Sequence, residues 1–262
     1  EILIGLVGSE MCIRDRGTYI GMLGGTDPAA KVLFATHLLS ASVMAVPGSI
    51  VLAKMLCPQT EEATDHVAIS GKEKENSNIL DAISSGTVTG VKLMTNIAAM
   101  LLVFISLVAL ANYITEGVIG RYTGLNDWIV KITDGKAQGL TFQFILGVIT
   151  SPFMWLIGVP SQDIMLVGSL LGQKTILNEF VAYFQLQQWK DAGLFMYEKS
   201  ILMSTYILCG FANISSIGIL LGGLGVLAPE KRGLISRIGV PAMIGGALVS
   251  VLSATIIGMI LG

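Results

Sequence analysis

Several long stretches of this chain contain no Asp, Glu, Lys or Arg. Among them are residues 93–115, 200–229 and 238–262. A helix needs roughly 20 apolar residues to cross about 30 Å of hydrocarbon, and each of these stretches exceeds that length. The pattern therefore predicts an all-α polytopic membrane protein.

The composition agrees with a chain that contacts lipid. Hydrophobic residues make up 53% of the 262 residues, charged residues 13%, and the mean hydropathy is +0.74. Soluble domains carry about 25% charged residues. A formal net charge of −2 provides no basic field for nucleic acid. The lipid bilayer is thus an expected partner and nucleic acid is not.

Residues 1–16 do not fit the pattern that follows them. A short apolar run passes into Glu10, Arg14, Asp15 and Arg16 before a membrane-like pattern resumes at Gly17. The basic start and small-residue cleavage site of a signal peptide are absent. We interpret residues 1–16 as a translated sequencing-adapter artefact and expect the natural protein to extend upstream.

Two apolar segments near the middle of the chain are too short to span a bilayer. Residues 164–173 lie between Asp163 and Lys174, and residues 180–189 lie between Glu179 and Lys190. The stretch 172–179 joins the two segments. Ten helical residues rise about 15 Å, half of the hydrocarbon thickness. The pattern predicts a re-entrant hairpin whose tip faces a cavity, since non-helical backbone at that depth needs protein or water around it. The alternative is an interfacial pair of Lys174 and Glu179 at the end of an ordinary helix.

The same region holds a carboxylate, and the next apolar span holds a second interruption. An acidic side chain inside the membrane is costly and indicates function by default, which makes Glu179 a candidate ligand for a polyhydroxyl compound or a cation. In residues 209–219, Asn213 and Ser216 favour a helix break and share one face. Phe211 offers a ring for stacking. The alternative is that these polar residues only hold helices together.

Two distant stretches are similar to each other. Residues 17–39 and 218–240 each run from a Gly-rich helix end through a turn with proline into another helix. By the positive-inside rule, residues 58–92 and 230–237 are cytoplasmic and the turn at 24–28 is external. Opposite placement of the two turns is typical of the inverted repeats of secondary transporters. Chance similarity of Gly-rich helix ends is the alternative.

The strings "GQKTILNEFVAY" (172–183) and "CGFANISSIGILLGGLG" (209–225) together resemble the concentrative nucleoside transporters. The resemblance covers residues 17–262. It implies a nucleoside symporter driven by Na⁺ or H⁺, working by alternating access in the cytoplasmic membrane as a homotrimer, with no cofactor besides the coupling ion. Glu179 and Asn213 would hold the ribose hydroxyls with Ser216 nearby, and Phe211 would pack against the nucleoside.

The resemblance completes the predicted set of substrate-binding residues and segments. The set is Gln173, Asn178, Glu179, Phe211, Asn213 and Ser216, with no metal ligand. The segments are 17–57, the tail of a first discontinuous helix and a transmembrane helix; 58–78, a cytoplasmic loop; 79–118, an amphipathic lead-in and a scaffold helix; 119–160, interfacial helices; 161–190, the re-entrant hairpin; and 199–262, a second discontinuous helix and the last transmembrane helix. The family's first hairpin would lie upstream of Gly17, so we expect the chain to be inactive alone.

Two other classes of membrane protein, an intramembrane hydrolase and a channel, fit the sequence less well. An intramembrane hydrolase would need Ser215 or Ser216 to meet a base such as His37 or Glu179, and no motif supports this. A channel would show a continuous polar stripe, whereas these spans are polar only at single interruptions. We therefore predict a transporter that is not an enzyme, and a structural role for His37.

Overall fold

The computed structural model describes residues 16–56, 58, 78–133, 135, 137–214, 216–217 and 232–262. Helices and short turns make up these residues, and no strand occurs among them. The all-α prediction is confirmed. One half of the similarity between residues 17–39 and 218–240 falls mostly outside the described residues, so the inverted repeat stays a prediction.

The helices follow one another with short connections. Residues 16–24 are helical, and the further elements are α2 (Pro28–Leu56), α3 (Ile79–Asn112), the π-helix η1 (Tyr113–Gly120), α4 (Arg121–Thr123), α5 (Leu125–Ile132), α6 (Phe142–Leu156), α7 (Ile164–Ile176), α8 (Glu179–Asp191), α9 (Glu198–Leu208) and α11 (Arg232–Leu261). The backbone stays helical from α3 into η1, with no turn between them.

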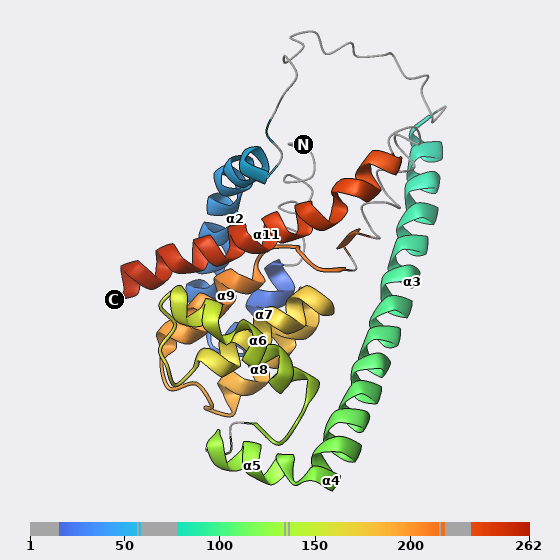
Figure 1. Ribbon diagram of the computed structural model, residues 1–262. Coiled ribbons are helices and arrows are strands. Elements are labelled where there is room, and N and C mark those ends of the chain that lie inside the picture. Colours follow the sequence, from blue (N-terminus) through green and yellow to red (C-terminus); the bar gives the residue numbers. More distant parts are fainter. Residues whose placement is uncertain are drawn as a thin grey trace.

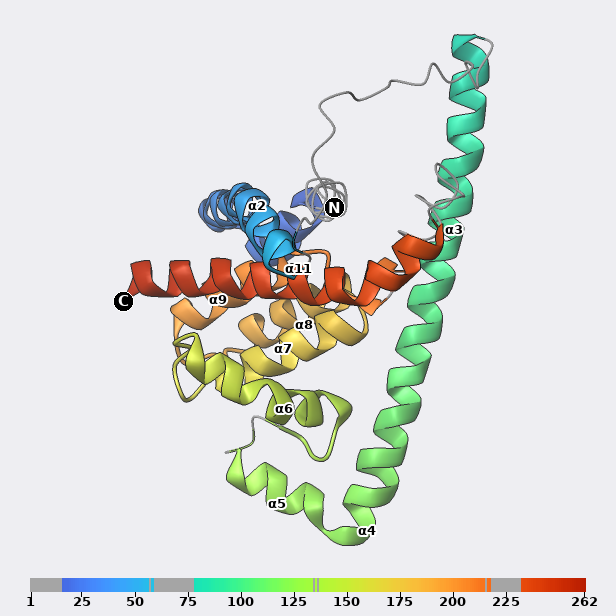
Figure 2. The ribbon, with the colours of Figure 1, turned by 45° about the horizontal axis from the view of Figure 1, so that its top comes forward.

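Helices α6 to α9 form a compact group, and α11 crosses over it beside α2 (Figures 1 and 2). The long helix α3 stands to one side and joins this group through α4 and α5. Asn112 at the end of α3 ties it to the start of α6, because its Oδ1 accepts from the Phe142 amide at 2.7 Å and its Nδ2 donates to Gln143 at 3.2 Å.

Two helices are long and apolar enough to cross a membrane among the described residues, at Pro28–Leu56 and Ser236–Leu261. Both keep large apolar side chains on the outside; Val32 is 67% exposed and Met259 is 78% exposed. Apolar surface of this extent is unfavourable in water and expected against lipid. The predicted span at 93–115 lies in α3 and the first residues of η1.

Helices α6 and α7 pack closely through glycines. A Cβ atom on Gly168 would lie 2.6 Å from the Thr150 hydroxyl and 3.0 Å from the carbonyl oxygen of Gly147. A Cβ atom on Gly172 would lie 2.5 Å from that of Leu146. Gly168 and Gly172 are four apart on one face, the spacing with which membrane helices approach each other closely. This contact fixes α7 against α6.

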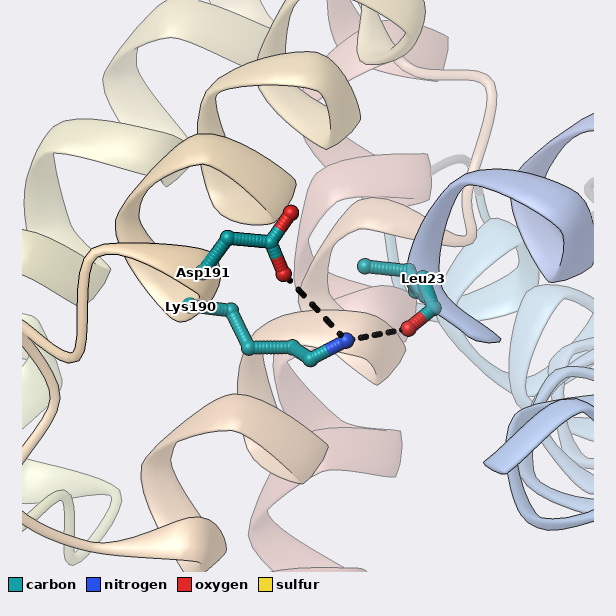
Figure 3. Close-up of polar contacts among 3 residues, drawn as sticks. All are labelled: Leu23, Lys190 and Asp191. Carbon is teal, nitrogen blue, oxygen red and sulfur yellow. Dashed lines mark hydrogen bonds and ion pairs between the residues drawn. The ribbon is translucent and has the colours of Figure 1, made fainter. Parts of the chain in front are cut away.

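The hairpin of α7 and α8 is also fixed to the N-terminal helix. Tyr19 stacks on Tyr183, with ring centroids 4.1 Å apart and planes inclined by 21°. At the far end of α8, the Lys190 ammonium donates to the carbonyl oxygen of Leu23 and lies 3.8 Å from Asp191 (Figure 3). The lysine thus neutralises the carbonyl end of helix 16–24, where cations are favourable.

The glycine contact leads to a first prediction. Gly168→Ala should lower the stability of the protein by about 1–3 kcal/mol, because backbone as well as the Thr150 side chain has to move. Gly21→Ala is the matched control: it is also helical, with nothing within 4 Å of an added Cβ. Midpoint temperatures in detergent measure both, and equal midpoints for the two variants would contradict close packing at Gly168.

Candidate functional site

The hairpin breaks at two residues only. Helix α7 ends at Ile176 and α8 begins at Glu179, with Leu177 at φ −93°, ψ −95° and Asn178 extended. Asn178 caps α8, since its side chain accepts from the Val181 amide at 2.9 Å, as Asn does at many helix starts. The break is shorter than the predicted tip 172–179. Gln173 and Lys174 stay helical, since α7 continues to Ile176 and the winding stops only at Leu177, directly before the Asn178 cap of α8.

The second break interrupts the apolar run that follows the hairpin. Helix α9 ends at Leu208, and residues 209–213 are not helical. Asn213 and Ser216 then cap a new helical turn reciprocally: the Ser216 amide donates to Asn213 Oδ1 at 2.7 Å, and the Asn213 amide donates to Ser216 Oγ at 3.3 Å. This is the geometry of a capping box. The polar residues of the sequence therefore mark where helix begins again.

A carboxylate and an amide connect the two breaks. Asn213 Nδ2 donates to Glu179 Oε2 at 2.7 Å. Glu179 is 5% exposed, Asn213 0% and Ser216 3%. Glu179 stands in the first turn of α8 and Asn213 caps the turn after the second break, so two helix N-termini meet here. Both carry partial positive charge and favour an ionised carboxylate between them.

The remaining predicted residues lie around this contact in different roles. Gln173 is buried on α7, and its amide nitrogen donates to Ser169 at 3.3 Å. Ser169 in turn donates to the carbonyl oxygen of Gln143 at 2.9 Å. Phe211 is half-buried inside the second break. Ser215 lies outside the described residues. The structure thus joins Glu179, Asn213 and Ser216 directly, uses Asn178 as a cap and places Gln173 in the contact with α6.

Two further buried charged residues, Asp163 and Lys174, belong to this arrangement, although the sequence alone did not place them in it. Asp163, before α7, accepts from the amides of Met196 and Tyr197 at 3.0 and 3.1 Å and so holds the start of α9. Lys174 is 0% exposed and donates to the carbonyl oxygen of Ile207. Their partners are distant in sequence, and only the charges inside apolar surroundings could have indicated them.

His37 has a structural contact. Its Nδ1 lies 3.1 Å from the Tyr206 hydroxyl, and the two rings meet edge to face with centroids 5.7 Å apart. The Ser216 hydroxyl donates to the carbonyl oxygen of Asn213 at 2.6 Å. These contacts do not place Ser216 and His37 as a nucleophile and its base. The His37 contact instead packs α2 against α9.

Residues 37–258 match the family model described as Na⁺ dependent nucleoside transporter C-terminus. The chain belongs to this family. The resemblance seen in residues 172–183 and 209–225 is thereby confirmed. Membership, together with the helices described above, places the protein in a membrane.

Several curated transporters are similar to this chain in sequence. An uncharacterized transporter of Haemophilus influenzae is 38% identical over 92% of this chain and 58% of its own length. Sodium/nucleoside cotransporter 1 of Rattus norvegicus is 37% identical over 96% of this chain and 39% of its own, and nucleoside permease NupC of Helicobacter pylori is 36% identical over 86% and 51%. The chain therefore spans about half the length of these curated relatives.

Solved structures of the transporter CNTnw have the same fold. A variant in an outward-facing state superposes with a TM-score of 0.74 at 35% identity, covering 93% of this chain and 57% of the other. An inward-facing substrate-bound state gives a TM-score of 0.69 at 34% identity, covering 92% and 56%. This chain thus shares its fold with about half of CNTnw.

The Asp163 contacts lead to a second prediction. Asp163→Ala should lower stability by about 1–3 kcal/mol, because two backbone amides at the start of α9 lose their buried acceptor. Asp191→Ala removes a carboxylate that is 59% exposed and is the matched control. Thermal unfolding in detergent measures the difference, and indistinguishable curves would show that Asp163 does not hold α9.

Proposed function

We propose that this chain forms half of a transporter that carries nucleosides across the cytoplasmic membrane by cation-coupled symport. The contact between Glu179 and Asn213 supports the proposal most directly, because it brings together two helix breaks that are 34 positions apart. The names of the curated relatives support nucleosides as the substrate class. Full transport activity is proposed for the whole protein that carries this sequence.

The chemistry of the contact suits a sugar with neighbouring hydroxyls. An ionised carboxylate only accepts hydrogen bonds, whereas the amide of Asn213 both donates and accepts. A pair of hydroxyls can donate to Glu179 and accept from Asn213, and hydrogen bonds to a charged group are the stronger kind. We propose that Glu179, Asn213 and Ser216 bind the ribose, with Phe211 packing against the nucleoside and Gln173 and Asn178 shaping the tip around it.

The burial of the site supports alternating access. The exposed fractions of Glu179, Asn213 and Ser216 are 5%, 0% and 3%, so a nucleoside reaches them only when the tip of the hairpin separates from the second break. Helices α7 and α8 have 13 residues each and are about 20 Å long, shorter than the hydrocarbon layer. We propose that they form a re-entrant hairpin with its tip near the middle of the membrane.

The assembly and the orientation complete the proposal. Helix α3 carries exposed apolar side chains along its length, such as Ile79, Met94 and Leu110. We propose α3 as the scaffold helix around which a homotrimer forms. The positive-inside rule places the loop before α3 and the start of α11 in the cytoplasm.

The substrate site leads to a third prediction. Glu179→Gln should lower the efficiency of uridine uptake by roughly 10- to 100-fold, because charge-assisted hydrogen bonds become neutral ones. Initial rates are compared in a transport-competent protein that carries this sequence, at equal amounts in the membrane. Glu198→Gln, which changes an exposed glutamate in the first turn of α9, should transport normally. Normal uptake by Glu179→Gln would refute the assignment.

The coupling ion leads to a fourth prediction. The family description names Na⁺, so we propose Na⁺ as the coupling ion. Replacing external Na⁺ by choline at constant pH should abolish concentrative uridine uptake, since the driving gradient is gone. Uptake that continues in choline and ceases when the proton gradient is collapsed would establish H⁺ instead.

A further inference from the structure

The broken end of α9 takes hydrogen bonds from both arms of the hairpin. A helix leaves its last four carbonyl groups without partners inside the helix. In α9, the carbonyl oxygen of Thr205 accepts from the Tyr183 hydroxyl of α8 at 2.9 Å. The carbonyl oxygen of Ile207 accepts from the Lys174 ammonium of α7 at 2.7 Å. Side chains from outside α9 thus stabilise the place where its winding stops.

Lys174 also connects this end to the last helix. Its ammonium donates to the Ser250 hydroxyl of α11 at 3.0 Å, and that hydroxyl donates to the carbonyl oxygen of Gly246 at 3.1 Å. Gly210 lies in the same place: a Cβ atom there would be 2.1 Å from Ser250 Oγ and 3.4 Å from Lys174 Nζ. The absence of a side chain at Gly210 therefore lets the ammonium and the hydroxyl meet beside the break.

The burial of the Lys174 ammonium costs free energy unless nearby negative charge compensates the lost hydration. The side chain is 0% exposed, and an ammonium loses its hydration when it is buried. The carbonyl end of α9 carries partial negative charge and offsets that loss. The position of the charge and the position of the helix end therefore depend on each other.

The tip of the hairpin holds the second break from both sides. On the side of α9, Lys174 donates to the carbonyl group of Ile207, just before the second break. On the other side, Glu179 accepts from Asn213, at the end of that break. We infer that Lys174 is a positioning residue: it fixes the end of α9 so that Asn213 stands at hydrogen-bonding distance from Glu179. This inference rests on the function proposed above, in which Glu179 and Asn213 bind the ribose hydroxyls.

A competition experiment tests this role. Uptake of labelled uridine is inhibited by unlabelled uridine and by 2′,3′-dideoxyuridine, which lacks the 2′ and 3′ hydroxyls of the ribose. The ratio of the inhibition constant of the dideoxy compound to that of uridine measures how strongly these two hydroxyls are recognised. Lys174→Met should reduce this ratio roughly fivefold or more, with the amount of protein in the membrane nearly unchanged. Where uptake is too slow, equilibrium binding of the two nucleosides to purified protein gives the same ratio.

Lys190→Met is the matched control. Lys190 also stands in the last turn of a hairpin helix and also neutralises the carbonyl end of another helix (Figure 3). It lies at the base of the hairpin, eleven positions along α8 from Glu179, about 16 Å away. Its replacement should leave the ratio unchanged. A purely structural contribution of the two lysines would change stability in both variants and the ratio in neither.

The outcomes separate the two proposals. A wild-type protein that does not distinguish uridine from the dideoxy compound overturns the proposed function and this inference with it. A wild-type preference that Lys174→Met retains in full overturns the role of Lys174 alone. Where Lys174→Met does not reach the membrane, the same ratio is measured for Ser250→Ala, because this variant removes one acceptor of the ammonium and keeps the lysine. A reduction of roughly two- to threefold is expected, and an unchanged ratio refutes the inference.

Discussion

The centre of this structure depends on one constraint: a helix that ends in the protein interior must find partners for its free backbone groups there. In the described part of the chain, two such helix ends lie beside the site, at residues 177–178 and 209–213. Asn178 supplies an acceptor at the first break, and Asn213 with Ser216 supplies the cap at the second. The carbonyl end of α9 obtains its donors from the hairpin. The second break is thus stabilised by side chains of the hairpin, and Asn213 in turn donates to Glu179 at the start of α8.

The neighbouring helices keep this pair of breaks in place. Gly168 and Gly172 let α7 approach α6 closely, and Asn112 fastens the start of α6 to the end of α3. The base of the hairpin is held by different contacts, among them Asp163 with the start of α9 and Lys190 with helix 16–24. Base and tip are therefore held by separate groups. The polar contacts at the tip converge on the site, whereas those at the base only join helix ends.

The sequence was informative where the signal is local. The apolar runs predicted the helices, and the Asn and Ser residues inside such runs predicted the breaks, because their side chains compete for backbone groups within a few positions. It was less informative about boundaries: Gln173 and Lys174 are polar yet helical, since polarity alone does not end a helix. Contacts between distant segments gave no local signal. Lys174 meets Ile207 and Ser250 at separations of 33 and 76 positions, and His37 meets Tyr206 at a separation of 169.

The separation of tip and base bears on how a site of this kind opens. Moving the whole hairpin away from α9 would expose the carbonyl groups of Thr205 and Ile207 and the Lys174 ammonium together, each of which loses a buried partner. Such groups are expensive to leave unsatisfied where water is scarce. Separating Glu179 from Asn213 breaks a hydrogen bond of 2.7 Å between groups that a polyhydroxyl ligand can satisfy again. Under the proposed function, the contact between those two residues is the one that a ligand replaces, while Lys174 and Tyr183 keep α9 attached to the hairpin.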